Sequence, residues 1–578
     1  MEWFSAPDYW IARFAVQRGI ALVYLIAFLV ALNQFRPLLG ENGFLPAPGF
    51  LRVVSFRQAP SIFHVHYSDR VFVAVAWTGI LLSTCALLTL PERAPLPVSM
   101  LVWFALWVLY MSIVNVGQVF YGFGWESLLL EAGFLAIFLG SFEVAAPVTI
   151  LWLFRWLLFR LEFGAGLIKL RGDPCWRNLT CLEYHHETQP MPNPLSWYFH
   201  HLPRVFHRIE VLGNHFAQLA APFLLFTPQP FAAVGAAIMV ATQLWLVLSG
   251  NFAWLNLITI VLAFSAVSDT WLHLVIPIAT PHQAAGGPLW YVVVVLAATA
   301  LVAFLSWWPV RNLLSRRQYM NASFNSLHLV NTYGAFGSVT RVRNEVVLEG
   351  TDEAEITPST TWKEYGFKGK PGDTGRRPPQ MAPYHLRLDW LMWFAALSPA
   401  YAHSWFVPLV VKLLENDRAT IKLLRSNPFP DAPPRYVRAQ FYRYRFTTRR
   451  ERKVTGEWWT RELVGDYLPA VSLQARRPQR AGAVAGFRRR SDAGATGLER
   501  TSLAAVGVAV VSQIPDAVVA LPLGFEHSAT GTDANFSRRQ AFVHLDRRID
   551  GERIHCIGHA HMRGSPPQTP DTPAPIIA

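Results

Sequence analysis

Two cysteines stand six residues apart in a polar stretch, Cys175 and Cys181. They could form a disulfide bridge, act as a redox pair or remain free thiols. Their spacing is not Cys-x-x-Cys, which makes a thioredoxin-type redox pair the weakest of the three alternatives. If the stretch faces an oxidising compartment, a bridge over so short a loop would stabilise the fold by about 2–3 kcal/mol in the chain-entropy model. We predict both residues as disulfide candidates.

Residues of the types that bind transition metals follow directly: Glu183, His185, His186 and Glu187. His185 and His186 are adjacent, and neighbouring side chains of an extended loop point to opposite sides. A metal site would therefore need ligands from elsewhere in the chain, for example His64 and His66. No standard zinc spacing is present. We predict neither a metal nor a cofactor, and we keep His185, His186 and Glu187 as candidates without an assigned role.

Five ionisable residues lie inside or at the end of otherwise apolar runs: Glu131, Arg155, Arg160, Glu162 and Lys169. A charge near the bilayer centre is costly, so such groups usually face a partner or a cavity. Arg155 and Glu162 are two helical turns apart and share a face, and Glu131 could pair with Arg155 or Arg160. A polar cavity for a substrate or ion is one interpretation. A structural ion pair inside a helix bundle, or an arginine reaching the interface, is the other, and we favour it.

These residues must be positioned by membrane helices. Of the 578 residues, 52% are hydrophobic and only 15% are charged, against about 25% charged in soluble domains. Nine apolar runs recur along the chain up to residue 308, and a membrane span needs about 20 such residues. They cover residues 19–35, 71–90, 98–120, 128–142, 148–170, 215–226, 231–248, 254–278 and 289–308. We predict an α-helical multi-pass bundle over 19–320 with eight or nine spans, preceded by an interfacial segment, 1–18.

Flanking charge gives the predicted orientation. Arg13 and Arg18 favour an N-terminus on the inside. With nine spans, the cysteine-containing loop and everything after residue 308 would then lie outside. Arg311, Arg316 and Arg317 follow the last run and favour the opposite arrangement. We predict the outside location for the loop and for the chain that follows the last span.

The chain from 321 to 474 reads as a small β-rich α+β domain outside the membrane. Alternating or β-branched residues predict strands at 326–333, 339–349, 361–367, 435–446 and 457–463. Helical runs are expected at 386–397, 405–415 and 418–425. Residues 475–578 differ again: they contain no Lys, Trp or Tyr and are heavy in Arg, Ala, Gly and Pro. Out-of-frame translation of a GC-rich gene is one hypothesis for this tail, and a disordered extension is the alternative.

Three stretches carry a resemblance to a known family. The first, residues 163–203, begins FGAGLIKLRGDPCWRN and ends PMPNPLSWYFHHLP; the second, 331–351, is NTYGAFGSVTRVRNEVVLEGT; the third, 384–394, is YHLRLDWLMWF. In this order they resemble the lipase maturation factor family, over about residues 1 to 474. The resemblance implies an endoplasmic-reticulum membrane protein that acts as a chaperone-like factor in protein maturation and helps dimeric lipases reach their active fold. It implies no catalytic residue.

Within the first stretch, prolines are expected to impose turns and extended pieces, and glycines to allow a close approach of another backbone. We call this stretch, residues 163–203, the signature loop. Trp197 is a further candidate within it, and with Trp176 and Tyr198 it could lie at the level of the lipid headgroups. In the C-terminal domain, client-docking candidates are Trp390, Trp393, Trp458 and Trp459, although ordinary core packing explains most aromatic residues.

We predict a membrane-embedded folding factor whose partners are membrane lipids and a secreted, lipase-like client. It would lie in the endoplasmic-reticulum membrane of a eukaryote or the plasma membrane of a bacterium. The net charge of +13 comes without a nucleic-acid-binding motif, so we expect no nucleic acid. The alternative is an integral membrane enzyme with a polar intramembrane cavity, distantly similar to the vitamin K-dependent carboxylase. Such an enzyme would use Lys169, Glu131, His185 or His186.

Overall fold

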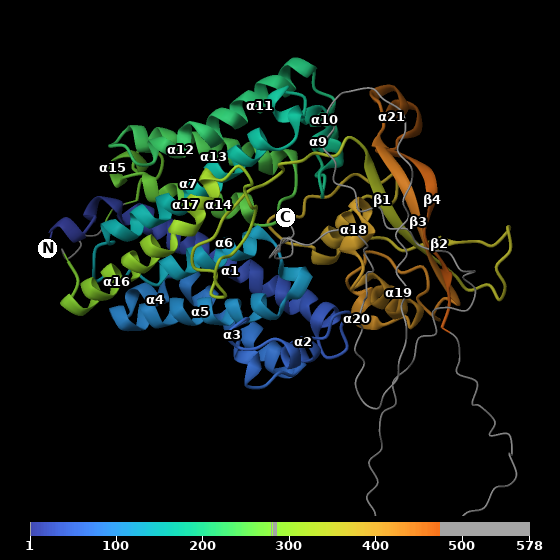
Figure 1. Ribbon diagram of the computed structural model, residues 1–578, viewed down its shortest axis with the longest axis horizontal. Coiled ribbons are helices and arrows are strands. Elements are labelled where there is room, and N and C mark those ends of the chain that lie inside the picture. The colour runs from blue at the N-terminus through green and yellow to red at the C-terminus, as the bar shows by residue number, and fades with distance from the viewer. Residues whose placement is uncertain (1, 279, 281–285, 474–578) are drawn as a thin grey trace, which may run out of the picture. The chain divides into compact units, whose positions relative to one another are not determined.

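The computed structural model describes residues 2–278, 280 and 286–473, in which a helical part is followed by a small sheet domain (Figure 1). The predictions for the tail, 475–578, lie outside the described residues. The helices of the first part are α1 (Trp10–Leu39), α2 (Ala47–Val53), α3 (Asp69–Leu87), α4 (Leu90–Arg93), α5 (Leu96–Val116), α6 (Gly124–Ala136), α7 (Val148–Arg171), α8 (Pro174–Arg177), α9 (Leu182–Thr188), α10 (Ser196–His200), α11 (Arg204–Leu219), α12 (Ala221–Leu224), α13 (Phe231–Ser249), α14 (Leu255–Ala263), α15 (Asp269–Leu272), α16 (Leu289–Leu305) and α17 (Trp307–Leu314).

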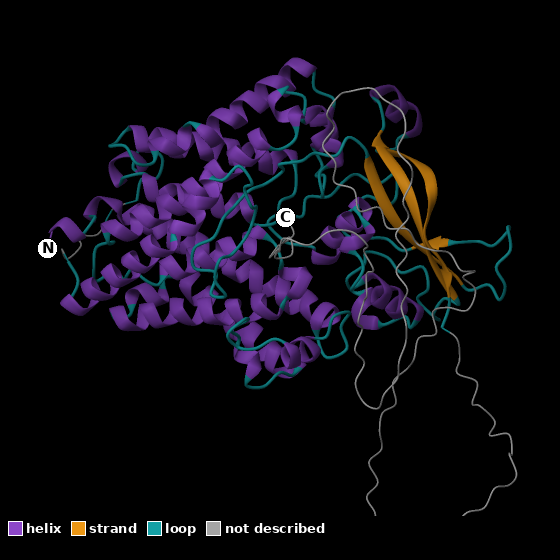
Figure 2. Ribbon diagram, viewed as in Figure 1, coloured by secondary structure: helices purple, strands orange, loops and turns teal. Residues whose placement is uncertain are grey.

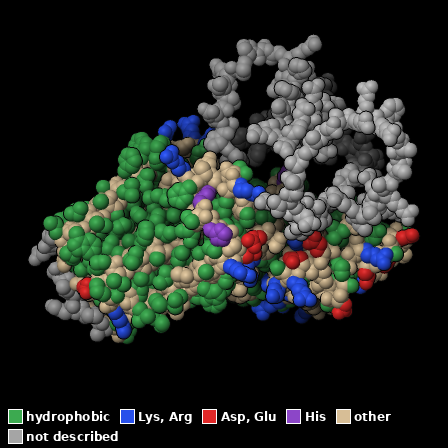
Figure 3. All heavy atoms as spheres, turned by 90° about the horizontal axis from the view of Figure 1, so that it is seen from below, with side chains coloured by type: hydrophobic (Ala, Val, Ile, Leu, Met, Phe, Trp, Pro, Cys, Tyr) green, Lys and Arg blue, Asp and Glu red, His purple; other side chains and the backbone are tan. Residues whose placement is uncertain are grey.

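Five helical stretches of the described chain are long and apolar enough to cross a membrane: Pro7–Leu39, Asp69–Leu87, Leu96–Val116, Phe231–Ser249 and Leu289–Leu314. The other predicted runs are shorter, carry charges or are interrupted. The run at 254–278 is divided between α14 and α15, and α7 carries Arg155, Arg160 and Glu162. On the face drawn in Figure 3, hydrophobic side chains cover the helical part at the left, and charged side chains gather at the right. This division is what a membrane part and a water-facing part require.

The two arginines used to predict the orientation have partners inside the protein. Arg13 lies within α1, is fully buried and donates hydrogen bonds to the carbonyls of Ser141 and Val144. Arg18 forms an ion pair with buried Glu92 at 2.7 Å. The predicted boundary at residue 18 falls inside α1, which is continuous from Trp10 to Leu39, and both arginines contact groups of the bundle.

A four-stranded antiparallel sheet, in the order β2-β1-β3-β4, forms the C-terminal part of the described chain (Figure 2). Its strands are β1 (Arg343–Thr351), β2 (Lys363–Glu364), β3 (Tyr436–Phe446) and β4 (Trp459–Val471). The predicted alternation of β1 marks a half-buried strand, yet nearly all of β1 is buried. It is a central strand, and α18 (Arg387–Leu397) packs against it. The helices α18, α19 (Phe406–Leu414) and α20 (Arg418–Ile421) confirm the expected helical insertion.

Three local features of this domain differ from the predictions, and the first is the strand expected at 361–367, of which only Lys363–Glu364 is a strand. Residues 326–333 form no strand; they make only an isolated bridge between Ser323 and Asn331, because their polar groups turn towards the bundle. Between β3 and β4 lies α21 (Arg449–Thr455), which we did not predict. Its signal is present in the sequence: Thr448 and Glu451 form a capping box, and Gly456 ends the helix with a positive φ of 76°.

The third signature stretch joins the sheet domain to the bundle. Arg387 donates a hydrogen bond to Glu126 of α6 at 2.8 Å, and both side chains are fully buried. His385 and Trp390 pack edge-on against Trp125, with ring centroids 5.1 and 4.9 Å away. Trp125 and Trp390 belong to one hydrophobic cluster that runs through both parts. The described chain is therefore a single packed body in which the sheet domain has a fixed position on the bundle.

Candidate functional site

The signature loop is helical rather than extended: α8, α9 and α10 lie within it. Pro174 occupies the first turn of α8, where its missing N–H leaves no hydrogen bond unmade, and Asp173 caps that helix by accepting from the N–H of Cys175. Pro174 thus starts a helix, whereas Pro203 has extended dihedral angles directly before α11. A disulfide joins Cys175 to Cys181, and both cysteines are buried. It closes the short segment between α8 and α9.

The second signature stretch holds the loop from the other side. Trp176 donates its indole N–H to the Phe336 carbonyl at 2.7 Å, and the N–H of Asp173 bonds the Gly337 carbonyl at 2.8 Å. At the surface, Arg341 forms two hydrogen bonds with Asp173. The Arg341 guanidinium, working against partial burial, holds the pKa of Asp173 at about 2. Residues about 160 apart in sequence therefore form one rigid unit.

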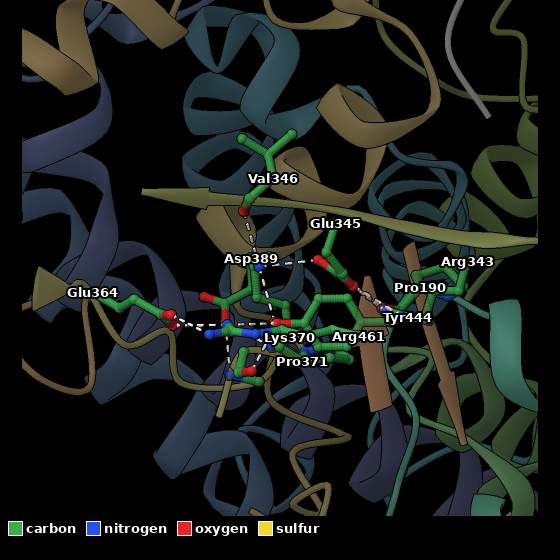
Figure 4. A network of polar contacts seen from close by, with 12 residues as sticks. Pro190, Arg343, Glu345, Val346, Glu364, Lys370, Pro371, Asp389, Tyr444 and Arg461 are labelled. Carbon is green, nitrogen blue, oxygen red and sulfur yellow. Dashed lines mark hydrogen bonds and ion pairs between the residues drawn. The ribbon is translucent and has the colours of Figure 1, made fainter. Parts of the chain in front are cut away.

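Arg343 of β1 fixes the end of α9, and we call this contact the Arg343 latch (Figure 4). Its guanidinium donates to the carbonyls of Glu187, Gln189 and Pro190 at 2.9, 2.5 and 3.1 Å. The same group forms an ion pair with Glu345 at 2.6 Å. The latch is fully buried, so its charge must be neutralised within the protein.

Lys370 supplies a second positive charge to the latch. Its ammonium lies 2.9 Å from the other carboxylate oxygen of Glu345 and donates to the carbonyls of Val346 and Pro371. Asp389 of α18 accepts the backbone N–H groups of Gly369 and Lys370 at 2.6 and 3.1 Å. Burial raises the pKa of Asp389, and these two hydrogen bonds oppose that shift. The network thereby ties α9, β1 and α18 together.

Trp197 joins α10 to the sheet domain instead of lying among lipid headgroups. It is 5% exposed and donates its indole N–H to the Thr447 carbonyl at 2.8 Å. Trp176 is also buried, whereas Tyr198 is exposed. The tryptophans proposed as docking residues are core residues as well: Trp390, Trp458 and Trp459 are buried and Trp393 is half-buried. Packing between domains, which the sequence could not reveal, accounts for these aromatic side chains.

The intramembrane candidates fall into two groups. Glu131 pairs with Arg160, and both are buried. Asn331 and Tyr333 of the second signature stretch donate to the same carboxylate at 3.0 and 2.7 Å. Arg155 takes no part; its guanidinium donates to the Ser265 and Leu225 carbonyls at 3.0 and 3.4 Å. This geometry agrees with the structural interpretation of these charges and anchors the second stretch in the bundle.

The second group surrounds Glu162 and Lys169, both buried in α7. Lys169 donates to Gln218 at 2.7 Å, and Gln218 donates to Glu162 at 3.1 Å. Gln243 of α13 donates to the other oxygen of Glu162 at 2.7 Å. An amide thus bridges the two charges, and Arg155 is not the partner of Glu162 although the two share a helix face. Sequence reasoning missed both glutamines, since a glutamine inside an apolar run is the only signal.

A cavity of about 740 Å³ lies beside this network. Its wall includes Leu161 of α7, Phe206 of α11, Leu246 of α13, Phe336 and Trp393. It therefore reaches from the bundle to the signature loop and to α18. The lining is mostly apolar, with Glu162, Lys169 and Glu210 as its charged members, so its chemistry suits an apolar guest with a small polar part.

The three polar candidates of α9 point to three different places. His185 lines the cavity with its ring 4.7 Å from that of Phe336. Burial, aided by neighbouring His186 and Lys169, lowers the pKa of His185 to about 3, so it is neutral at physiological pH. His186 lies beside Glu210 of α11, with 3.4 Å between Nε2 and Oε2. Glu187 accepts the Phe446 N–H at 2.7 Å, and burial raises the pKa of its carboxyl.

Two family models match the chain, a lipase maturation factor transmembrane domain over residues 11–274 and a lipase maturation factor C-terminal domain over 329–469. The chain is 43% identical to lipase maturation factor 1 of Bos taurus over 509 residues, 82% of this chain and 91% of that protein. Identity to lipase maturation factor 1 of Homo sapiens is 42% over 506 residues, 81% of this chain and 89% of that protein.

Lipase maturation factor 2 of Homo sapiens is 30% identical over 593 residues, covering 79% of this chain and 82% of that protein. No solved structure matches the chain. The comparisons give no support to the carboxylase-like alternative. The transmembrane-domain match and the candidate spans make the chain an integral membrane protein. Since both domain models match in order and the similarity covers most of the chain, the chain belongs to the lipase maturation factor family.

Proposed function

We propose that this protein is a membrane-embedded maturation factor that helps a secreted lipase reach its active fold. The observation that carries the proposal is the match to both family domains together with 43% identity over 91% of lipase maturation factor 1. The rigid attachment of the sheet domain supports it, because a client at the membrane surface would meet a preformed outer domain and the cavity beneath it.

The finer topology is part of the proposal. We infer eight or nine spans and favour nine, in which α6, α7, α14 and the run 215–226, formed by the end of α11 and by α12, cross besides the five long apolar stretches. Four crossings then separate the signature loop from the sheet domain, so both lie on the same side. The polar groups of α7 can be accommodated there because Arg160 pairs with Glu131, and Glu162 accepts from two amides. The signature loop and the sheet domain share one side through the Arg343 latch. We assign that side to the outside, where the Cys175–Cys181 disulfide persists.

In a eukaryotic cell the outside of this membrane is the endoplasmic-reticulum lumen, and in a bacterium it is the periplasmic face of the plasma membrane. Thiol labelling in sealed vesicles tests the side. In right-side-out vesicles of a bacterial plasma membrane, a membrane-impermeant maleimide should label Cys175 and Cys181 only after reduction, without opening of the vesicle. In sealed endoplasmic-reticulum microsomes, whose interior is the lumen, the same labelling should need both reduction and permeabilisation. Labelling that needs opening of the bacterial vesicles, or that occurs in unopened microsomes, would contradict the assignment.

The function is tested by expressing the chain together with a secreted lipase in cells that lack their own lipase maturation factors. The readout is lipase activity per amount of lipase protein in the medium. We expect this specific activity to rise well above that of cells without the chain. An unchanged specific activity, at normal expression of the chain, would contradict the proposed function.

We further propose that the cavity holds an apolar segment of the client. Ala241 of α13 lines the cavity, and Ala237 lies one turn earlier on the same helix outside it; both are exposed. Ala241→Trp should fill part of the cavity and lower lipase maturation, whereas Ala237→Trp should leave it unchanged. Equal activity of the two variants would remove the cavity from the mechanism while leaving the maturation function intact.

A further inference from the structure

Three potential metal ligands meet between the signature loop and α11. His186 belongs to α9, and His207 and Glu210 lie one turn apart on α11, so they share a face of that helix. The Oε2 atom of Glu210 is 3.4 Å from Nε2 of His186 and 3.9 Å from Nδ1 of His207. All three ligand atoms lie within 4.8 Å of one another.

These three polar side chains are buried, which is uncommon for histidine and glutamate. The side chains of His186 and His207 are each 2% exposed and that of Glu210 is 11% exposed. The Nδ1 atom of His207 is buried and has no hydrogen-bond partner within the described part of the chain. Leaving a buried polar atom unpaired is costly, and this atom faces a carboxylate at a distance too long for a hydrogen bond.

The distances are close to those of a tetrahedral zinc site. Zinc–nitrogen and zinc–oxygen bonds of about 2.1 Å place ligand atoms about 3.4 Å apart. The His186–Glu210 separation already has this value, and a shift of His207 by at most about 1.4 Å would close the remaining gaps. The second oxygen of Glu210 accepts the indole N–H of Trp245 at 2.7 Å, which orients the carboxylate as outer-shell partners of metal ligands do.

We propose that His186, His207 and Glu210 bind one divalent transition-metal ion, with zinc as the preferred metal. The ion joins α9 to α11 beside the cavity, whose wall includes His185 and Glu210. It thereby holds the signature loop at a second point, in addition to the Arg343 latch. Two histidines and one carboxylate leave a fourth position for water, and they are nitrogen and oxygen ligands that zinc accepts. The site goes beyond the proposed maturation function.

The test measures metal content in the full chain purified in detergent with a histidine-free affinity tag. After zinc is added and the excess removed by gel filtration, elemental analysis should find about one zinc per chain. His207→Gln and Glu210→Gln should each reduce this to below about 0.1. His215→Gln is the matched control on α11: His215 bonds the Trp176 carbonyl at 3.1 Å and is outside the cluster, so that variant should keep its zinc.

A second measurement needs no variant and therefore does not depend on the folding of a mutant. Cobalt(II) added to the wild-type chain should produce the visible absorption of a tetrahedral site. X-ray absorption of the zinc form should show nitrogen and oxygen neighbours without sulfur. Absence of both signals, zinc retained equally by His207→Gln and Glu210→Gln, or sulfur in the first shell would each overturn the proposal.

Discussion

Arg343→Met tests whether the latch holds the signature loop in place. The substitution removes one partner of a buried ion pair, a change that typically costs about 3–5 kcal/mol. It also removes the donors to the carbonyls of Glu187, Gln189 and Pro190, each worth about 1–3 kcal/mol when left unpaired in a dry site. Water entering the site would offset part of this second cost, so we expect the free energy of unfolding to fall by about 3–5 kcal/mol in total.

The matched control is Arg341→Met, two residues earlier. Arg341 also pairs with a carboxylate of the signature loop, Asp173, but its side chain is 44% exposed. Exposed pairs contribute about 0.2–1 kcal/mol. Arg341 and Arg343 thus provide the same type of contact to the same loop in different dielectric surroundings, and the comparison isolates the effect of burial.

The assay is thermal unfolding of the full chain in detergent, followed by tryptophan fluorescence. If a unit of 150–250 residues unfolds cooperatively, Arg343→Met should lower Tm by about 6–20 °C and Arg341→Met by less than about 4 °C. Amide hydrogen exchange of residues 186–203 should accelerate in Arg343→Met alone. Equal Tm values for the two variants, with unchanged exchange in that segment, would refute the latch.

Gly164→Ala should lower the free energy of unfolding by about 1–3 kcal/mol, since its Cβ would lie 2.5 Å from the Tyr333 carbonyl oxygen. Gly213→Ala on α11, where a Cβ has no atom within 4 Å, is the control and should leave the unfolding temperature unchanged. Cys181→Ser should lower the free energy of unfolding by about 2–3 kcal/mol, and dithiothreitol should lower the unfolding temperature of the wild type alone. An equal decrease in the variant would exclude the disulfide as the cause. Glu131→Gln should lower the free energy of unfolding by about 3–5 kcal/mol, because Arg160 is left buried without its carboxylate partner. Adding Arg160→Met should restore part of this stability, and additive losses for the two substitutions in chemical denaturation would contradict the pairing.

Local composition predicted the elements whose surroundings it reflects. Lipid demands continuous apolar helices, and runs such as 71–90, 98–120 and 231–248 coincide with α3, α5 and α13. The alternation at 435–446 marked β3, although the near-complete burial of β1 depended on its central place in the sheet and on α18. The strand predicted at 326–333 was wrong for a related reason. These residues have the composition of a strand, but Asn331 donates a hydrogen bond to Glu131, 200 residues earlier, so the segment contacts the bundle instead of a sheet.

The amino-acid pattern was enough to predict a membrane bundle followed by an α+β domain, and it marked the signature loop and its cysteines. The partners of these residues became known from the folded chain. Arg343 reaches carbonyls more than 150 residues away, and His186 meets His207 and Glu210 instead of His64, whose Nε2 lies 3.0 Å from the Ala59 carbonyl oxygen. Such contacts arise because helices and strands far apart in the chain pack to bury apolar surface, and no local periodicity records which polar groups that packing brings together.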